Sequence, residues 1–220
     1  MIEDDKRRAA QAAVAEVRDG MLVGLGTGST VAFAIDALVR ARPRIETVAT
    51  SEDSARKARA GGLVVRDFAD VAHVDLTIDG ADEIDPQFRA IKGAGGAMLR
   101  EKIVAAASAR MIVIADASKR VATLGAAKLP VEVLPFARAF VAARLTALGA
   151  RVEPRNGLSD NGNIILDAHF GVMADPAALA RAIEEIPGAL GHGLFLTEVD
   201  AAYIAENGVV TRLERGAASG

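Results

Sequence analysis

The 220-residue sequence contains no cysteine, no tryptophan and only one tyrosine. Without cysteine, the chain can form no disulfide, no thiolate nucleophile and no cysteine-ligated zinc or iron–sulfur cluster. The scarcity of large aromatic side chains argues against a stacking platform for sugars or nucleic-acid bases. The three histidines, His73, His169 and His192, are far apart in sequence, and no pair has the spacing of a helical metal site. We therefore expect no catalytic histidine and no metal site built on cysteines or on a pair of histidines in one helix.

An excess of charge of either sign is also missing, because 26 lysines and arginines face 29 acidic residues. Nucleic-acid binders usually show a basic balance or a basic stripe, so we expect no nucleic-acid partner. Apolar stretches such as residues 111–115 are far too short to span a bilayer, so we expect no membrane partner. The first five residues include three acids, which is unlike a signal or transit peptide, and we expect a cytoplasmic protein.

What the chain does have is apolar sequence, 51% of all residues, which is enough to bury a full core. Short apolar runs alternate with helical patterns in the first part of the chain. Strands are expected at 21–25, 45–49, 63–65, 74–79 and 111–115. Helices are expected at 9–18, 31–40 and 97–108, and a further helix follows the strand at 45–49 and ends at residue 60. This alternation predicts a parallel sheet covered by helices on both faces.

The pattern changes after about residue 129. Strands are expected at 130–133, 151–153, 163–170 and 193–197, with helices at 140–148 and 177–186. Two helices on a small, mostly antiparallel sheet form an α+β unit. We predict an α/β protein with a Rossmann-like, mostly parallel sheet domain (1–128 and 199–220) plus a smaller α+β, ferredoxin-like domain (129–198). The small domain is expected to act as a lid or in oligomerisation, and strands at 202–205 and 209–213 are expected to rejoin the first sheet.

The first chemical motif is the glycine-rich segment GLGTGST at residues 24–30, which follows a strand and opens a helix. Glycines let the backbone approach a ligand, and the amides at a helix N-terminus attract anions. The glycine spacing differs from the dinucleotide fingerprint, and no lysine follows as in a P-loop. The alternative is a tight turn in which a Ser or Thr caps the helix.

The second motif places four carboxylates within residues 79–85, directly after a buried strand. Open α/β sheets bind ligands at the carboxyl ends of their strands. The carboxylates suit acid–base chemistry, hydroxyl binding or a divalent metal. The alternative is a solvated acidic turn.

Two further loops carry lysines. The segment KGAGG at 92–96 precedes a helix that contains Glu101, and DASK at 116–119 follows the strand at 111–115. Taken singly, Glu101 suits a solvent-facing helix position and Lys119 a surface lysine. Taken together, four loops converge on one edge of the sheet with two anion cradles, two lysines and several carboxylates. The convergence predicts a site for a small anionic substrate.

These segments, namely GTGST at 26–30, DGADE at 79–83, KGAGG at 92–96 with REK at 100–102, and DASK at 116–119, resemble ribose-5-phosphate isomerase of the A type in order and spacing. The resemblance continues through LSDNGN at 158–163, IPG at 186–188 and HGLF at 192–195, and so covers nearly the whole chain. One departure is Ala94, where the family pattern has glycine.

The resemblance implies interconversion of D-ribose 5-phosphate and D-ribulose 5-phosphate through an enediolate, in the non-oxidative branch of the pentose phosphate pathway, without a cofactor or metal. It implies that Glu101 is the base that moves a proton between C1 and C2. It also implies that Asp79 and Asp82 bind hydroxyls and help to open the furanose ring. The implied substrate-binding residues are Thr27, Gly28, Ser29, Thr30, Asp79, Gly80, Ala81, Asp82, Lys92, Gly93, Ala94, Gly95 and Lys119, with Lys6 as a further candidate.

Aldose–ketose isomerisation needs a carboxylate to carry a proton and donors to stabilise the enediolate, and the four loops supply both. The alternative from another class is a non-catalytic sugar-phosphate-sensing module on the same sheet. Such a module would need the phosphate cradle but neither Glu101 nor the paired aspartates. The family resemblance further implies a homodimer or homotetramer.

Overall fold

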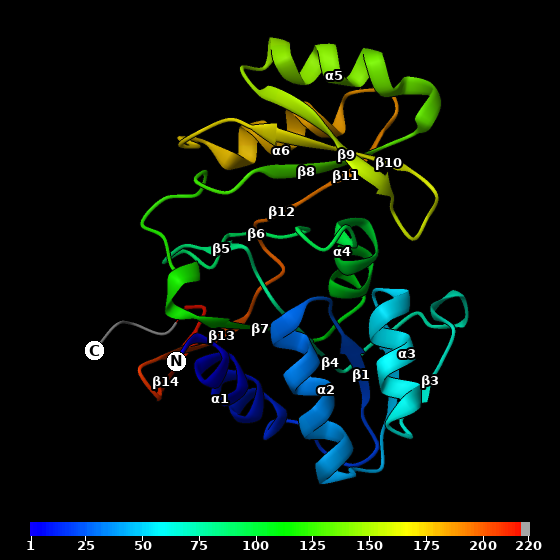
Figure 1. Cartoon of the computed structure of the whole chain (residues 1–220), viewed down its shortest axis with the longest axis vertical. Coiled ribbons are helices and arrows are strands. Elements are labelled where there is room, and N and C mark those ends of the chain that lie inside the picture. Colours follow the sequence, from blue (N-terminus) through cyan, green and yellow to red (C-terminus); the bar gives the residue numbers. More distant parts are fainter. Residues whose placement is uncertain (217–220) are drawn as a thin grey trace. The chain divides into compact units, whose positions relative to one another are not determined.

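The computed structural model describes residues 1–216, and the chain divides into two compact units (Figure 1). The first unit contains Met1–Ala81, Arg100–Arg120 and the chain from Thr197 on. The second contains Asp82–Leu99 and Val121–Leu196. No helix within residues 1–216 is both long enough and apolar enough to cross a membrane.

The first unit is built on a seven-stranded sheet with the order β14-β13-β7-β4-β1-β2-β3. Its strands are β1 (Leu22–Leu25), β2 (Glu46–Ala49), β3 (Val64–Val65), β4 (Leu76–Asp79), β7 (Met111–Asp116), β13 (Ala201–Glu206) and β14 (Val209–Glu214). All neighbouring pairs are parallel except β13 and β14, which form an antiparallel edge. The predicted Rossmann-like, mostly parallel sheet and the return of the last two strands to it are confirmed.

Helices cover both faces of this sheet. They are α1 (Ile2–Val14), α2 (Ser29–Ala41), α3 (Glu52–Ala60) and α4 (Met98–Ala106), with short 3-10 turns η1 (Phe68–Asp70) and η2 (Ala117–Lys119). The buried face of α1 packs with α2 and with Val23, Leu25 and Ile78 of the sheet. On the opposite face, Val104 of α4 packs with Val48 and Val74. Successive strand residues point to opposite faces, so alternate residues of β1 and β4 face α4.

The second unit contains a four-stranded antiparallel sheet with the order β11-β8-β10-β9 and a three-stranded sheet with the order β12-β6-β5. Its elements are β5 (Glu83–Ile84), β6 (Ala90–Ile91), β8 (Leu129–Val133), η3 (Pro135–Ala137), α5 (Arg138–Ala147), β9 (Arg151–Leu158), β10 (Ile164–His169), α6 (Pro176–Glu184), β11 (Ala189–His192) and β12 (Leu194–Phe195). Both helices contribute to one core, through Val141 and Leu145 of α5 and Ile183 of α6. The predicted smaller α+β fold is confirmed.

The predicted bounds were residues 1–128 and 199–220 for the sheet domain and residues 129–198 for the smaller domain. In the structure, residues 82–99 and 121–128 instead cluster with the second unit. Strand β6 pairs with β12 across about a hundred residues of sequence. The Val121 N–H also donates to the Ile84 carbonyl at 3.0 Å. Strands β5, β6 and β12 are each two residues long, too short for a hydrophobic pattern in the sequence to predict them.

The first helix was predicted at 9–18 but spans Ile2–Val14, so that prediction was wrong at both ends. Glu3, Asp4 and Asp5 occupy its first turn, where negative charge interacts favourably with the helix dipole. The strand predicted at 193–197 is shorter in the structure, where β12 spans only Leu194–Phe195 and belongs to a different sheet from β11, which ends at His192.

Candidate active site

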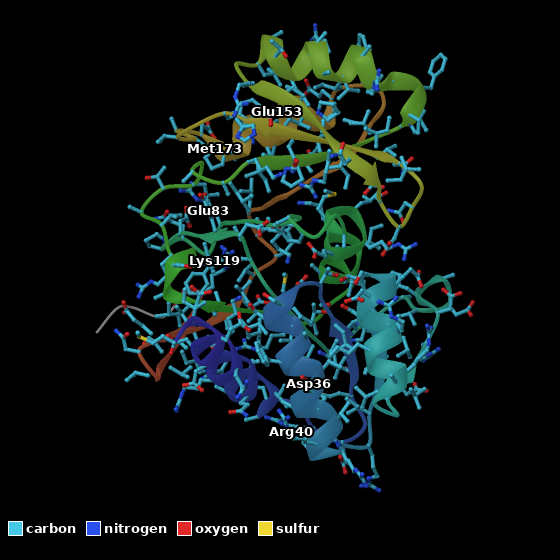
Figure 2. The ribbon with its side chains drawn as sticks, in the orientation of Figure 1. Asp36, Arg40, Glu83, Lys119, Glu153 and Met173 are labelled. Atoms are coloured by element: carbon cyan, nitrogen blue, oxygen red, sulfur yellow. The ribbon has the colours of Figure 1, made fainter. Side chains whose placement is uncertain are left out.

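The predicted site residues divide between the two units. The first unit holds Lys6, Thr27–Thr30, Asp79–Ala81, Glu101 and Lys119, and the second holds Asp82 and Lys92–Gly95. Within the first unit, the loops after β1, β4 and β7 follow the carboxyl ends of three adjacent parallel strands. Lys119 lies in η2, directly after β7 (Figure 2). The predicted convergence at one sheet edge therefore holds for these three loops.

The turn after β1 leads directly into the N-terminus of α2. Gly28 precedes the first turn of α2 and has a φ of 110°. Glycine adopts this backbone conformation readily. Amides in the first turn of a helix have no intrahelical acceptor, and the helix dipole adds partial positive charge there. Gly28 and Ser29 are exposed, and Lys6 Nζ donates to Ser29 Oγ at 3.1 Å. The structure thus places a lysine from α1 beside this turn.

The carboxylate of Asp79 holds the same turn from the neighbouring strand. Asp79 is fully buried, and its Oδ1 accepts hydrogen bonds from the N–H groups of Thr27 (3.1 Å) and Gly80 (2.7 Å). A Cβ atom on Gly26 would lie under 3.0 Å from this carboxylate, so only glycine leaves room for it. The turn is fixed on its other side by a 2.8 Å hydrogen bond between the hydroxyls of Thr27 and Thr50.

Glu101 lies on the face of α4 that is directed at the sheet. It precedes Val104 by three residues, and residues three apart share a helix face. Val104 packs near Gly24 of β1, and Gly24, Thr77 and Asp79 point to that same sheet face. Glu101 is only 3% exposed, which excludes the alternative of a solvent-facing helix position.

In the second unit, Asp82 is bound to the glycine-rich loop that follows β6. The Ala94 N–H donates to Asp82 Oδ2 at 2.9 Å, and the Asp82 N–H donates to the Ile91 carbonyl at 2.8 Å. Lys92 is 2% exposed, and its Nζ lies 5.4 Å from the centroid of the Phe195 ring. An ammonium group at this distance interacts favourably with the ring face.

Ala94 departs from the family pattern without straining the loop. Gly93 and Gly96 have φ values of 102° and 84°, whereas Ala94 is not among the residues with positive φ. The Ala94 side chain is exposed. A methyl group is therefore compatible with the backbone at this position.

The other two carboxylates at 79–85, Glu83 and Asp85, are also hydrogen-bonded within the protein. Glu83 is buried and accepts hydrogen bonds from the N–H groups of Gly125 (2.7 Å) and Ala127. Asp85 accepts from the Gln87 and Arg89 amides and from Arg89 Nε. Within residues 1–216, no group of three or more acidic or histidine side chains is gathered in a way that could hold a metal ion.

The comparisons with known proteins all give the same family. Residues 46–208 match the family model described as ribose 5-phosphate isomerase A (phosphoriboisomerase A). Proteins named ribose-5-phosphate isomerase A from Sphingopyxis alaskensis and Gloeobacter violaceus are 53% and 49% identical to the chain, each over 97% of both chains.

Solved structures agree with these relatives. The ribose 5-phosphate isomerase A of Neisseria gonorrhoeae superposes with a TM-score of 0.95 at 36% identity, covering 98% of both chains. A D-ribose-5-phosphate isomerase in complex with phospho-erythronic acid superposes with a TM-score of 0.93 at 33% identity, over 98% of this chain and 100% of that one.

Proposed function

Because the chain belongs to the ribose 5-phosphate isomerase A family, we propose a residue-level account of its reaction, the interconversion of D-ribose 5-phosphate and D-ribulose 5-phosphate. The observation that supports this proposal is a pair of buried carboxylates, Asp79 and Glu101, on one sheet face, with the N-terminus of α2 beside Asp79. A carboxylate that is almost fully shielded from water suits proton transfer to and from carbon.

In the proposed reaction, Glu101 takes the proton from C2 of the open-chain aldose. The electron pair of the C2–H bond forms the C1–C2 double bond of an enediolate. A proton then moves from the C2 hydroxyl to the C1 oxygen, and Glu101 returns its proton to C1, which leaves a ketone at C2. No electron leaves the substrate, so the step needs no redox partner.

The other site residues bind and stabilise the substrate in this account. Asp79 and Asp82 accept hydrogen bonds from sugar hydroxyls and assist ring opening. The Lys92 ammonium and the amides of the Gly93–Gly95 loop stabilise the negative charge of the enediolate. Gly80 and Ala81, which lie between the two aspartates in sequence, also line the substrate. Lys119 is the remaining substrate-binding residue.

The phosphate is assigned to Thr27–Thr30, with Lys6 as an additional cation. Exposed amides at a helix N-terminus, two hydroxyls and a nearby ammonium suit a dianion. Much of the binding energy of a small substrate then comes from a group remote from the reacting carbons and orients them.

Replacing Thr30 by glutamate is expected to raise KM at least about tenfold, because a carboxylate would repel the phosphate in the first turn of α2. Initial rates over a range of ribose 5-phosphate concentrations measure this change. Thr30→Gln controls for side-chain size without charge. An unchanged KM in Thr30→Glu would assign the phosphate to another loop.

The function itself is tested by incubating the purified chain with ribose 5-phosphate and following ribulose 5-phosphate. Steady formation of the ketose is expected. Binding of the sugar phosphate without turnover would favour the sensing module, which the comparisons do not support. A cytoplasmic location is still a prediction from the sequence.

We further propose that the chain is a homodimer or homotetramer that assembles through its second unit. Around η3 and α5, the side chains of Phe136, Phe140 and Leu134 are 98%, 51% and 44% exposed. Exposed apolar groups gathered in one region are typical of contact surfaces. Sedimentation of the wild type is expected to give two or four times the mass of one chain. Phe136→Asp is expected to lower the measured mass towards that of one chain. Val209→Asp in β14 is the matched control. A monomeric wild type would contradict the proposal.

A further inference from the structure

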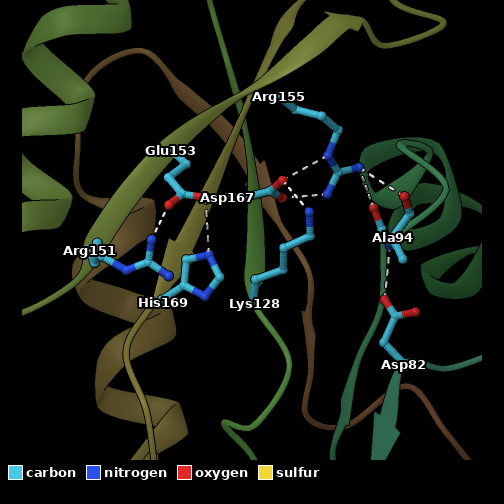
Figure 3. Close-up of polar contacts among 9 residues, drawn as sticks. Asp82, Ala94, Lys128, Arg151, Glu153, Arg155, Asp167 and His169 are labelled. Atoms are coloured by element: carbon cyan, nitrogen blue, oxygen red, sulfur yellow. Dashed lines mark hydrogen bonds and ion pairs between the residues drawn. The ribbon is translucent and has the colours of Figure 1, made fainter.

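Arg155 connects strand β9 to the glycine-rich loop after β6, all within the second unit (Figure 3). Its Nη1 donates to the carbonyl oxygens of Gly93 (2.9 Å) and Ala94 (3.1 Å). The other edge of the guanidinium donates to Asp167, with Nε at 3.1 Å from Oδ2 and Nη2 bound to Oδ1. The planar guanidinium therefore bridges a carboxylate and two loop carbonyls, which a lysine cannot do in the same geometry.

Asp167 is a fixed anchor for this bridge. It lies in β10, is 4% exposed and also accepts a 2.6 Å hydrogen bond from Lys128 Nζ. Burial alone would raise the pKa of Asp167, but hydrogen bonds from Arg155 and Lys128 outweigh burial and hold the pKa below its usual range. The anchor thus stays ionised at neutral pH and keeps its two cations in place.

The peptide group between Gly93 and Ala94 is held at both ends. Its carbonyl oxygen accepts from Arg155, and its N–H donates to Asp82 Oδ2 at 2.9 Å. A chain of hydrogen bonds runs from Asp167 through Arg155 and this peptide to Asp82 (Figure 3). Successive hydrogen bonds of this kind polarise and strengthen one another.

The loop benefits from such an anchor because glycine is frequent in its backbone. Gly93 and Gly96 both have positive φ, and the Gly96 N–H donates to the Gly93 carbonyl at 2.9 Å. Glycine is the least restricted residue, so without outside contacts the peptide planes at 93–95 can rotate. Rotation of the Gly93–Ala94 plane would take the N–H away from Asp82.

We propose that Arg155 is a positioning residue for the isomerisation: through the Gly93–Ala94 peptide it sets the orientation of the Lys92–Gly95 loop and of Asp82. This inference rests on the roles proposed above for the loop and for Asp82. Arg155 touches no reacting atom. Its contribution lies in holding a binding loop in its productive geometry, where a displacement of about 1 Å costs about a hundredfold in rate.

The matched variants are Arg155→Ala and Arg151→Ala. Both arginines lie on β9, but Arg151 forms an exposed ion pair with Glu153 (Figure 3). Arg155→Ala is expected to lower kcat/KM about tenfold to a hundredfold. Arg151→Ala is expected to stay within about twofold of the wild type, as usual for loss of an exposed ion pair. Circular dichroism and thermal unfolding establish that both variants fold.

Rescue separates positioning from general support of the fold. Guanidinium ion at millimolar, non-denaturing concentration is expected to restore part of the activity of Arg155→Ala and to leave Arg151→Ala unchanged. Arg155→Lys is expected to remain impaired, because one ammonium cannot span Asp167 and both carbonyls. Wild-type activity in folded Arg155→Ala, or a loss that guanidinium does not reverse, would overturn the proposal.

A second readout does not depend on turnover. Amide hydrogen exchange at Ala94 is expected to be at least about tenfold faster in Arg155→Ala than in the wild type, because the N–H would spend less time bound to Asp82. Unchanged exchange would overturn the positioning role even if activity falls. An inactive wild type with accelerated exchange in the variant would instead count against the proposed function and leave the contact itself established.

Discussion

Replacing Glu101 by glutamine is expected to lower kcat by about two to four orders of magnitude, the usual range for loss of a general base. Glutamine keeps the size and hydrogen-bonding reach of the side chain but cannot accept a proton. KM is expected to change little, because the substrate is held by groups other than the base. Steady-state rates with ribose 5-phosphate, measured on protein of verified fold, give both constants.

The matched control is Glu52→Gln at the start of α3. Glu52 is exposed and forms a 2.9 Å ion pair with Arg100, the residue directly before Glu101. This variant removes the ion pair of Arg100, which lies in the same helix turn as Glu101, and leaves Glu101 itself unchanged. Its kcat is expected to stay within about twofold of the wild type. Near-normal kcat in Glu101→Gln would place the base elsewhere, with Asp79 and Asp82 as the next candidates.

Replacing Gly26 by alanine is expected to lower kcat/KM by at least about a hundredfold. The new Cβ would come under 3.0 Å from the Asp79 carboxylate, so the carboxylate or strand β1 must shift. Asp79 would then release the Thr27 N–H and move the turn that binds phosphate. Overpacking of this kind also destabilises the fold by about 1–3 kcal/mol.

Gly24→Ala provides the control for that overpacking. Its Cβ would also come under 3.0 Å from two side chains, Thr77 of β4 and Val104 of α4, but neither of them is hydrogen-bonded to the Thr27 amide as Asp79 is. Both variants are therefore expected to lose similar stability on thermal unfolding, while only Gly26→Ala loses most of its activity. Equal losses of activity at matched stability would show that the effect comes from the strand and not from the carboxylate.

The sequence was sufficient to predict the carboxyl edge of the first sheet. Runs such as residues 111–115 are entirely apolar and short, which favours a buried strand, and the polar residue that follows such a strand is then expected at the sheet edge. The expected positions of Asp79, of the Thr27–Thr30 turn and of Lys119 follow from that rule alone. The helix with Glu101 had a residue pattern that also suited an exposed position, and only its burial in the structure separates the two.

The roles within the acidic segment could not be separated in advance. Asp82, Glu83 and Asp85 are carboxylates within four residues, and local pattern treats them alike. Glu83 is structural because the amide of Gly125, 42 residues later, donates to it. Long-range partners of this kind depend on the pairing of short strands, which sequence periodicity does not reveal.

Arg155 was missed for a related reason. In the β9–β10 hairpin Asp167 pairs with Glu153, and Arg155, two residues further along β9, is its diagonal neighbour on the same face. Opposite charges on the two sides of the turn at 158–163 are a signal that could have been used. Its contacts with the Gly93 and Ala94 carbonyls join residues about sixty positions apart. No residue pattern in either segment points to the other.

Conversion of ribose 5-phosphate in deuterium oxide tests whether a protein carboxylate, Glu101, carries the proton between C1 and C2. The wild type is expected to form ribulose 5-phosphate with solvent deuterium at C1, as seen by proton NMR. Glu101→Gln is expected to lose deuterium incorporation in step with its loss of turnover. Deuterium exchange at the wild-type rate in Glu101→Gln would contradict the assignment.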